Sequence, residues 1–370
     1  MRQRRPNLLL AAVHFLLLRG TAHPLADHYD TVRSVAGGGD GPIGAGGGAG
    51  AGAPDLDPDL VADFKDFVMV YRAELLALIA ARSTQTNEVG RCTALLPALT
   101  TIAGGYPDGQ PLWLLDLGTS AGLNLLFDSY AYTYRPRSDA DSDSASESEG
   151  VALQAGRRDA LVHLDCAVRG ELGDLPALDL PPVAGRTGID ALPIDPTSED
   201  GADWLLACLW PDNLPRFDRL RGALATARLT ADPPTVYRGD IIDDLPGVVE
   251  GIDTDTDGPL VVFHSWVAAY LSPERQAELV ETVRALSHAR PLHYLYAESP
   301  IETPGLPTPP SPSPSSTSHL ATAVVHIAPD GSPPVRLADM HHHGKWLRWW
   351  PTPTDPTGRH AGPAPAPPRR

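Results

Sequence analysis

The stretch Trp113–Asp128, WLLDLGTSAGLNLLFD, places a glycine turn between two apolar segments. The turn, Gly118 to Gly122, allows two interpretations. As G-x-S-x-G it is a nucleophile elbow, which would hold out Ser120 as the nucleophile of a hydrolase. As D-x-G-x-x-x-G, counted from Asp116, it is a turn that lets backbone approach a ligand between a strand and a helix. The surrounding sequence has to decide between a catalytic serine and a ligand-cradling turn.

Composition limits the class of protein. The chain has 370 residues, but its 39 prolines and 34 glycines are concentrated in a few stretches, so the folded part is shorter than the chain. The net charge of -17 argues against nucleic acid as a partner, since phosphate contacts need a basic surface. Three cysteines without a C-x-x-C pair favour a reducing compartment. We therefore expect a cytoplasmic protein with a small-molecule ligand.

The N-terminus contains a segment that imitates a secretory signal. Arginines precede the apolar run Leu8 to Leu18. This run is too short to span a membrane, which takes about 20 apolar residues. The alternative is a buried helix of the domain, interrupted by His14. We expect no association with a membrane.

Low-complexity stretches divide the chain. We expect a helical N-terminal part over residues 1–104 and an α/β domain over residues 105–350. Three stretches are expected to be insertions and one a disordered Pro-rich tail, because their compositions cannot form a packed core: Gly-rich 36–56, acidic 136–150, Pro-rich 303–318, and the tail 351–370.

Apolar spacing predicts the helices. One long amphipathic helix is expected from Pro58 to Arg82 and a second over Val89 to Thr101. In the α/β domain the segment directly after the glycine turn, residues 120–132, is expected to continue as a helix. Further helices are expected over residues 204–210, 214–229 and 272–289.

Short apolar runs predict the strands, and none is expected before residue 110. The expected strands that alternate with helices cover residues 112–118, 160–168, 185–190, 234–240, 259–263 and 291–299. An antiparallel pair follows, over residues 321–329 and 334–340. This order of elements predicts a mainly parallel sheet with crossover helices and an antiparallel finish.

This order favours the ligand turn over the elbow. In hydrolases with an elbow, several strands precede it and one of their loops supplies half the oxyanion hole. Here the preceding hundred residues look helical. A hydrolase would also need an acid and a histidine after Ser120, for which Asp240 with His264 or His293, or the late histidines, are candidates.

The strand ends carry acids suited to a nucleotide-like ligand. Asp116 would lie beside the ligand at the end of the first strand, the edge where open α/β sheets bind ligands. Asp190 ends the second strand and could accept hydrogen bonds from ribose hydroxyls. Asp240, near the end of the third, could accept one from the exocyclic amine of an adenine.

This arrangement resembles the Rossmann-like class I S-adenosylmethionine-dependent methyltransferases over residues 105–350. The shared features are the acidic glycine turn, the acids that end the second and third strands, and the late antiparallel hairpin. The resemblance implies S-adenosylmethionine as cofactor. The serine at position 120 departs from the family's usual glycine. The cofactor-binding residues carried over are Asp116, Gly118, Ser120, Gly122, Asn124, Asp190 and Asp240.

A narrower resemblance rests on longer strings. They are LLLAAVHFLLLRG, QTNEVGRC, DLGTSAGLNLLFD, GIDALPID, WLLACLWPDN and VVFHSWVAAYLS. In this order they are similar to an uncharacterised domain-of-unknown-function family from prokaryotes. That resemblance places the apolar N-terminal run inside the domain and implies no activity.

Methyl transfer requires alignment of the acceptor with the methyl group, and a base where the acceptor must lose a proton. The acceptor is expected beside the ends of the first and fourth strands, which makes His264 the candidate base and Ser265 a substrate contact. The alternative for His264 is a histidine packed at a strand end.

Two further segments are polar. In QTNEVGR, Asn87, Glu88 and Arg91 could form a lid over the ligand, and the alternative is a helix connection with a local ion pair. The run His341–His343 near Asp339 has no coherent ligand spacing, so no metal is expected. The sequence leaves three hypotheses: a methyltransferase, an esterase-like hydrolase that uses Ser120, and a non-catalytic binding module.

Overall fold

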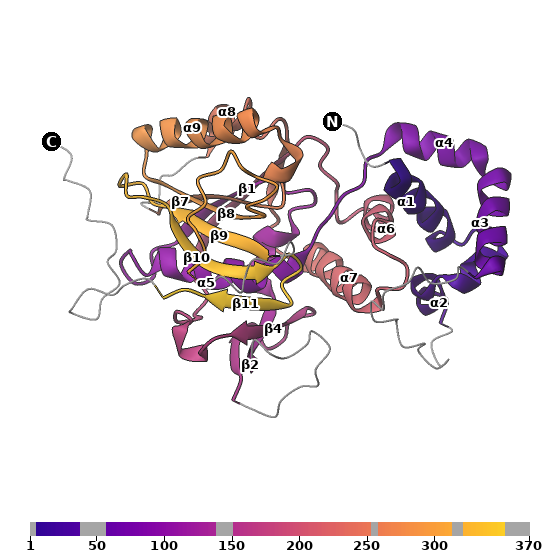
Figure 1. The fold of residues 1–370 in the computed structure, drawn as a ribbon, viewed down its shortest axis with the longest axis horizontal. Helices are drawn as coiled ribbons and strands as arrows, with labels where there is room; N and C mark the ends of the chain where they lie inside the picture. Colours follow the sequence, from indigo (N-terminus) through magenta and orange to yellow (C-terminus); the bar gives the residue numbers. More distant parts are fainter. Residues whose placement is uncertain (1–4, 38–56, 138–150, 253–257, 313–320, 352–370) are drawn as a thin grey trace. The chain divides into compact units, whose positions relative to one another are not determined.

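The computed structural model describes residues 5–37, 57–137, 151–252, 258–312 and 321–351. Most of the Gly-rich and acidic insertions and nearly all of the Pro-rich tail fall outside these ranges. The chain divides into two compact units, coloured by sequence in Figure 1. The first contains Met1–Asn87 and Asp195–Arg228, and the second contains Glu88–Ile194 and Leu229–Arg370. Residues 88–104, expected in the N-terminal part, lie with the second unit.

The first unit is helical. Its helices are α1 (Arg5–Leu18), α2 (Asp30–Val35), α3 (Pro58–Val70), α4 (Arg72–Ala81), α6 (Glu199–Ala207) and α7 (Leu214–Leu229). The apolar N-terminal run forms α1, and its Val13 and Leu17 are buried against Phe67 and Leu75. These contacts show that α1 is a buried helix of this unit.

His14, the polar residue within the apolar helix α1, is accommodated by contacts with polar groups. Its Nε2 lies 2.8 Å from Thr31 Oγ1, and its Nδ1 lies 3.2 Å from the carbonyl oxygens of both Ala207 and Leu209. Burial lowers the pKa of His14 to about 4, although the two carbonyls partly oppose this shift. The neutral imidazole therefore joins α1, α2 and the end of α6.

The prediction of a single helix from Pro58 to Arg82 is wrong. The structure has two helices, because Tyr71 adopts φ -99° and ψ 26°, outside the helical geometry. The Tyr71 ring packs against Phe67, with ring centroids 4.6 Å apart. The break lets α3 and α4 both cover the core around α1, which a straight helix with the same apolar stripe would not do.

The second unit contains an eleven-stranded sheet. Its order is β3-β2-β4-β11-β10-β9-β8-β7-β1-β5-β6, and six of the ten neighbouring pairs are parallel. The strands are β1 (Leu112–Leu117), β2 (Ala131–Arg137), β3 (Leu153–Gly156), β4 (His163–Arg169), β5 (Val183–Asp190), β6 (Thr235–Arg238), β7 (Leu260–Ser265), β8 (Leu292–Glu298), β9 (Ala321–Ile327), β10 (Val335–His341) and β11 (Trp346–Trp349). The expected mixed α/β fold with a mainly parallel sheet and an antiparallel finish is confirmed at this level.

Helices cover both faces of the sheet. Figure 1 shows α8 (Leu245–Gly251) and α9 (Pro273–Ala289) together on one face. Their buried side chains pack with Leu115, Leu117 and Val262 in one core. The other face carries α5 (Cys92–Ala103). Because side chains alternate along a strand, each residue of β1 and β7 faces one of these two layers.

The prediction of a helix directly after the glycine turn is wrong. The chain forms a short 3-10 segment, Leu123–Ser129, and then strand β2. Tyrosines at alternate positions of the following segment give a strand period. Tyr130 and Tyr132 donate hydroxyl hydrogen bonds to the carbonyls of Leu123 and Phe127. Side chains thus satisfy carbonyls that an α-helix would satisfy with its own backbone.

Two other boundaries differ from the expectation. Helix α6 begins at Glu199, where the Ser198 hydroxyl caps it, and ends at Ala207, before the expected range 204–210 is complete. The first part of the expected Pro-rich insertion, residues 303–312, packs on the fold. Pro307 accepts a hydrogen bond from the Tyr296 hydroxyl.

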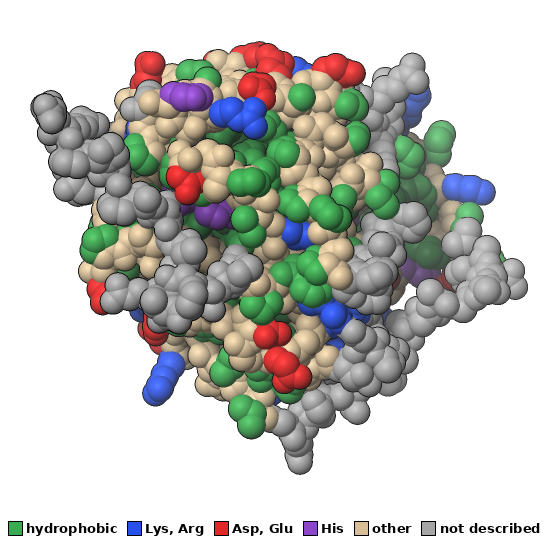
Figure 2. All heavy atoms as spheres, turned by 60° about the vertical axis from the view of Figure 1, so that its left-hand side comes forward, with side chains coloured by type: hydrophobic (Ala, Val, Ile, Leu, Met, Phe, Trp, Pro, Cys, Tyr) green, Lys and Arg blue, Asp and Glu red, His purple; other side chains and the backbone are tan. Residues whose placement is uncertain are grey.

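Acidic side chains lie in small groups on the face drawn in Figure 2, and lysine and arginine are scattered over it. This distribution agrees with the net charge of -17. Within the described ranges, every helix is too short or too polar to cross a bilayer.

Candidate functional site

The carboxyl ends of β1 and β7 lie at a reversal of strand order. Strands β5 and β6 follow on one side of β1, whereas β7 and β8 lie on its other side. All four pairings among these five strands are parallel. In open α/β sheets, ligands bind in the crevice at such a switch point. The glycine turn follows β1 directly, and Ser265 ends β7.

The turn after β1 is tightly held. Gly118 has φ +68° and donates its N–H to Ile189 O at 2.7 Å. A Cβ at Gly118 would lie 2.6 Å from Val267 Cγ2, so glycine is required there by packing as well as by φ. Ser120 has φ +55°, a conformation that non-glycine residues rarely adopt. Gly122 has φ +73° and leads into the 3-10 segment.

Asp116 lies on the face that carries α5, because its neighbours Leu115 and Leu117 belong to the opposite core. The carboxyl group is buried, with 4% of the residue exposed, and it accepts a hydrogen bond from Thr119 Oγ1 at 2.9 Å. Burial raises its pKa to about 8; the Thr119 hydrogen bond opposes the shift, and Asp190 adds to it. At neutral pH this carboxyl is therefore mostly protonated.

Asp190 holds the turn from the end of β5. Its Oδ2 accepts the N–H of Ser120 at 2.8 Å, and its Oδ1 accepts the N–H of Leu192 at 2.8 Å. The carbonyl of Ser120 accepts the N–H of Ile194. Asp190, which was expected to accept hydrogen bonds from ribose hydroxyls, therefore braces the turn in this structure.

Asp240 follows β6 and is half-exposed. Its Oδ1 accepts the N–H groups of Ile242 and Asp243 and pairs with Arg275 Nη2 at 2.9 Å. These contacts leave Oδ2 as the oxygen that could meet an exocyclic amine.

A cavity lies between α5 and the sheet. Its empty space, mouth included, is about 340 Å³. Its walls are mainly apolar, with polar groups from Arg91, Asn124 and Ser265. The lining residues are Arg91, Ala94, Leu95, Asn124, Phe263, His264, Ser265, Leu295, Tyr296, Ala297 and Val324.

Arg91 joins three segments at this cavity. Its Nη1 donates to Ser265 O at 2.9 Å and to Ser265 Oγ at 3.3 Å, and its Nε donates to His342 O at 3.0 Å. The guanidinium also lies 6.0 Å from the centre of the Trp266 ring. The structure thus brings together Arg91, Ser265 and Asn124 from the predicted residues.

The other predicted lid residues, Asn87 and Glu88, are not among the residues that line this cavity. Glu88 is buried; its Oε1 accepts the N–H of Gly90, and its Oε2 lies 3.3 Å from His343 Nδ1. Asn87 belongs to the first compact unit. The Asn124 Oδ1 atom lies 3.5 Å from Cys92 Sγ, at the start of α5.

His264 lies on the opposite face from Asp116. Asp116 pairs with Phe263 across the β1–β7 ladder, so the next residue, His264, points the other way. Its Nδ1 is 2.7 Å from Glu298 Oε1 and its Nε2 is 2.8 Å from the Tyr294 hydroxyl. The expected base beside the acceptor is therefore corrected to the alternative, a packed histidine at the strand end.

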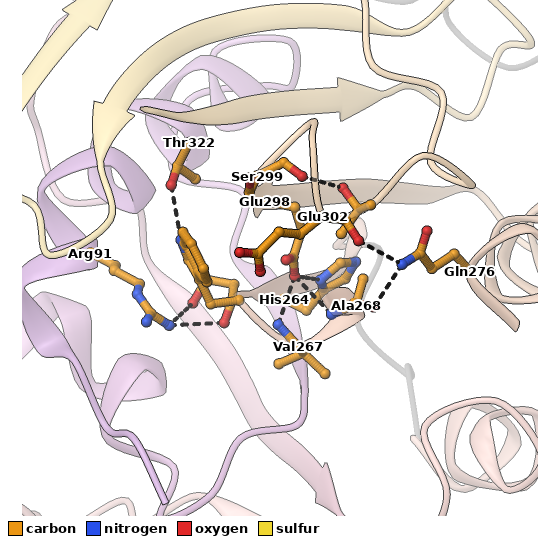
Figure 3. A network of polar contacts seen from close by, with 12 residues as sticks. Arg91, His264, Val267, Ala268, Gln276, Glu298, Ser299, Glu302 and Thr322 are labelled. Atoms are coloured by element: carbon orange, nitrogen blue, oxygen red, sulfur yellow. Dashed lines mark hydrogen bonds and ion pairs between the residues drawn. The ribbon is translucent and has the colours of Figure 1, made fainter. Parts of the chain in front are cut away.

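Figure 3 shows what the sequence interpretation missed, the contacts around Glu298. Its Oε1 accepts the N–H groups of Val267 and Ala268 at 2.8 Å and 3.0 Å, in addition to its contact with His264. Its Oε2 is buried and has no hydrogen-bond partner within the described part of the chain. The alternation of Tyr294, Tyr296 and Glu298 in YLYAE was the signal that these side chains share one face.

Glu298 fixes the backbone beside the turn. Trp266, directly after β7, has φ +55°, and its indole N–H donates to Thr322 Oγ1 at 2.9 Å. The next residue, Val267, packs against Gly118. The described ranges contain no group of three or more potential ligands that could hold a metal ion.

Three comparisons with known proteins complete this description. A family described as "Uncharacterized protein conserved in bacteria (DUF2332)" matches residues 1–349, which confirms the narrower family resemblance. Among solved structures, the sugar N-methyltransferase KedS8 from a Streptoalloteichus species is 12% identical over 76% of this chain and 71% of that chain. Its TM-score of 0.23 is too low to establish a shared fold. No curated protein matches the chain.

Proposed function

The chain belongs to the DUF2332 family of bacterial proteins, and from this premise we propose that it binds S-adenosylmethionine where β1 and β7 end. We propose further that it transfers the methyl group to a small molecule in the cavity beside Arg91 and Ser265. The proposal combines the strand order, the glycine turn and the acids at the strand ends. It concerns the second compact unit alone.

One observation carries the proposal. Among the described residues, only Ser120 and Trp266 are non-glycine residues with positive φ, both at +55°. They follow the carboxyl ends of β1 and β7, the two strands at the switch point. Strained backbone conformations persist where the surrounding structure enforces them, and they cluster at active sites and ligand clamps.

The residues present fit the cofactor at three points. S-adenosylmethionine supplies a methyl group on a positively charged sulfur. The Asp116 carboxyl, which ionises near pH 8, would gain a favourable interaction with that charge. Asp190 retains lone pairs for ribose hydroxyls because each carboxylate oxygen accepts two hydrogen bonds. Asp240 Oδ2 would accept the adenine amine.

The glycine turn would contribute to cofactor binding through the shape of its backbone and not through charged side chains. Val267 fills the space at Gly118, so we assign Gly118, Ser120 and Gly122 the role of shaping the turn. Asn124 lines the cavity and would lie between cofactor and acceptor. Glu88 stays a predicted lid residue, whereas Asn87 belongs to the first compact unit and has no part in this proposal.

The alternatives predict different observations. A hydrolase would need a histidine for Ser120, but both ring nitrogens of His264 and of His293 contact other side chains. Labelling of Ser120 by a fluorophosphonate probe would support that alternative. A binding module would bind the cofactor without methyl transfer to any of a panel of small molecules.

Calorimetry with S-adenosylmethionine and S-adenosylhomocysteine tests the proposal. We expect one site per chain. Asp116→Asn should weaken binding of the sulfonium compound more than that of the homocysteine compound, because only the former carries the extra positive charge. Asp108→Asn, at an exposed loop residue, is the matched control. Absence of binding to folded protein at both low and high salt would overturn the proposal.

A further inference from the structure

We propose that Tyr106, His293 and His326 form an acid-operated latch, which ties the loop after α5 to the sheet near neutral pH and releases it in acid. The loop, residues 104–110, joins α5 to β1. None of the three side chains lines the cavity beside α5. The latch therefore does not depend on the proposed function.

The three side chains form one hydrogen-bonded chain from the loop to two strands. The Tyr106 hydroxyl lies 2.7 Å from His293 Nε2 on β8, and His293 Nδ1 lies 2.8 Å from His326 Nε2 on β9. The two imidazole rings stack with centroids 5.0 Å apart, and the Tyr106 ring meets the His293 ring edge-on. His293 is buried, with 1% of the residue exposed. These contacts attach the loop to β8 and β9.

This chain accommodates one extra proton but not two. With both histidines neutral, each hydrogen bond has one donor and one acceptor. One imidazolium keeps both bonds, since His293 can then donate from Nδ1 to His326 and from Nε2 to the Tyr106 oxygen. A second proton places an N–H on each side of the 2.8 Å contact, which removes that bond and sets two positive charges against each other. The rings then separate, and Tyr106, which contacts the buried ring, is displaced with them.

Burial opposes protonation while the latch is closed. It lowers the pKa of His293 to about 3 and that of His326 to about 4; the charge on His326 adds to the shift of His293, and Asp330 opposes both shifts. Burial also raises the pKa of Tyr106, with Asp330 adding to this shift, so the tyrosine stays a neutral hydroxyl. A released histidine has the ordinary pKa of about 6.5. The open state therefore takes up protons at a pH at which the closed state does not.

The positions beside the two histidines on the neighbouring elements are apolar. Their register partners on β7, β8 and β10 are Val261, Leu295 and Val335. Helix α5, CTALLPALTTIA, has no acidic or basic side chain. Asp108 shares the loop with Tyr106 and is exposed. The carboxylate that acts on both histidines is Asp330, in the turn between β9 and β10.

Acid should open the latch with a steep pH dependence. The pKa values of the closed state lie below the ordinary value, so the stabilisation of the closed state is fully present above about pH 6.5 and is lost as the pH falls toward about 4. Each histidine that takes up a proton on opening shifts the equilibrium by up to about tenfold per pH unit in this range. The two histidines together give up to about a hundredfold.

Hydrogen exchange followed by mass spectrometry measures the opening in the full chain. Four N–H groups of the loop donate backbone hydrogen bonds, those of Gly104, Gly105, Tyr106 and Gln110. Such groups exchange only when the loop opens. Protection factors, which relate the exchange rate to that of an unstructured chain at the same pH, are compared at pH 7, 6 and 5. We expect protection of residues 104–110 to fall roughly fiftyfold from pH 6 to pH 5.

Three variants assign the effect to the latch. His326→Gln leaves one histidine that takes up a proton, so the fall should be less than about tenfold over the same pH unit. Tyr106→Phe removes the hydroxyl that anchors the loop, so protection should be low already at pH 7 and depend little on pH. His163→Gln, at an exposed residue of β4, is the matched control and should behave as the unchanged protein.

Protection of β1 separates the latch from unfolding of the whole unit. Strand β1 is paired on both sides, with β5 and β7, so its N–H groups exchange only when the sheet opens. We expect its protection to change less with pH than that of residues 104–110. A loop without protection at pH 7, an equal fall in the loop and in β1, or a fall in His326→Gln as large as in the unchanged protein would each overturn the proposal.

Discussion

Ser120, in the turn after β1, and Asp116, near the end of β1, carry unusual free-energy terms. Ser120 has φ +55°, where a side chain costs about 1–2 kcal/mol relative to the right-handed region. Asp116 keeps a buried carboxyl whose pKa is raised to about 8. The strain at Ser120 disfavours folding at every pH, and the buried Asp116 carboxyl disfavours folding more strongly as the pH rises. A ligand site at the switch point would explain why both are kept.

Replacement of Ser120 by glycine should stabilise the protein. Glycine adopts positive φ without strain but loses more entropy on folding, so we expect a gain of about 1 kcal/mol in the free energy of unfolding. Urea titration measures this gain. Ser287→Gly within α9 is the control and should lower the same quantity by a similar amount. A loss at Ser120 equal to that at Ser287 would show that the turn is unstrained.

The raised pKa of Asp116 determines how the stability of the folded protein should change with pH. Its pKa is raised in the folded protein, so the folded state binds more protons than the unfolded state between about pH 4 and pH 8. The contribution to stability is fully present below pH 4 and is lost as the pH rises through 8. Asp116→Asn should remove this loss, a gain on the order of a few kcal/mol at pH 9. Melting temperatures of both proteins from pH 5 to pH 9 measure it, and parallel curves would contradict the assignment.

The helices and strands could be predicted from the sequence where burial of apolar side chains alone determines them. Buried apolar runs marked β1, β5, β7 and β8, and apolar spacing marked α9. The segment after the turn was misjudged because its apolar residues suit a helix, while the Tyr130 and Tyr132 hydroxyls satisfy its carbonyls instead. Local periodicity does not reveal such long-range partners.

The candidate site shows the same limit. Asp116, Gly118 and Asp190 were recognisable because each ends a strand or forms its turn. The face of His264 was not recognisable, since it depends on strand register, and a one-residue shift reverses every side chain. Glu298 was missed because its contacts are with backbone N–H groups that the sequence does not place.

Glu298 should be the strongest positioning residue for the segment after β7. Glu298→Ala would leave the N–H groups of Val267 and Ala268 and the His264 ring without their acceptor, at a cost of about 3 kcal/mol or more. Glu298→Gln keeps an acceptor oxygen and should cost less. Urea titration of both measures the difference. Glu281→Ala, at an exposed residue of α9, is the control, and a loss no greater than this control would contradict the role of Glu298.

At the scale of the whole molecule, the charge of -17 is the dominant property. Like charges on one surface repel and destabilise the compact state. Added salt screens this repulsion, since the Debye length falls from about 10 Å at 0.1 M to about 3 Å at 1 M. On the face drawn in Figure 2, lysine and arginine side chains are scattered, so the negative charge of the acidic groups is neutralised only where a basic side chain lies beside them.

The melting temperature should therefore rise with sodium chloride concentration between 0.05 M and 1 M, values chosen to span about an order of magnitude in ionic strength. Lys65→Glu, at an exposed residue of α3, makes the net charge two units more negative and should enlarge the rise. Lys65→Arg keeps the charge and should leave the rise unchanged. A fall in melting temperature with salt would show that attractive ion pairs outweigh the repulsion.

Calorimetry of S-adenosylmethionine at pH 7 in two buffers of different ionisation enthalpy measures whether a cationic cofactor binds beside Asp116. Asp116 is mostly protonated before binding and should release its proton as the sulfonium arrives. The binding enthalpy is therefore expected to depend on the buffer. This dependence should be smaller for S-adenosylhomocysteine and absent in Asp116→Asn. A folded protein that binds neither compound, or that binds S-adenosylmethionine with the same enthalpy in both buffers, would contradict the claim.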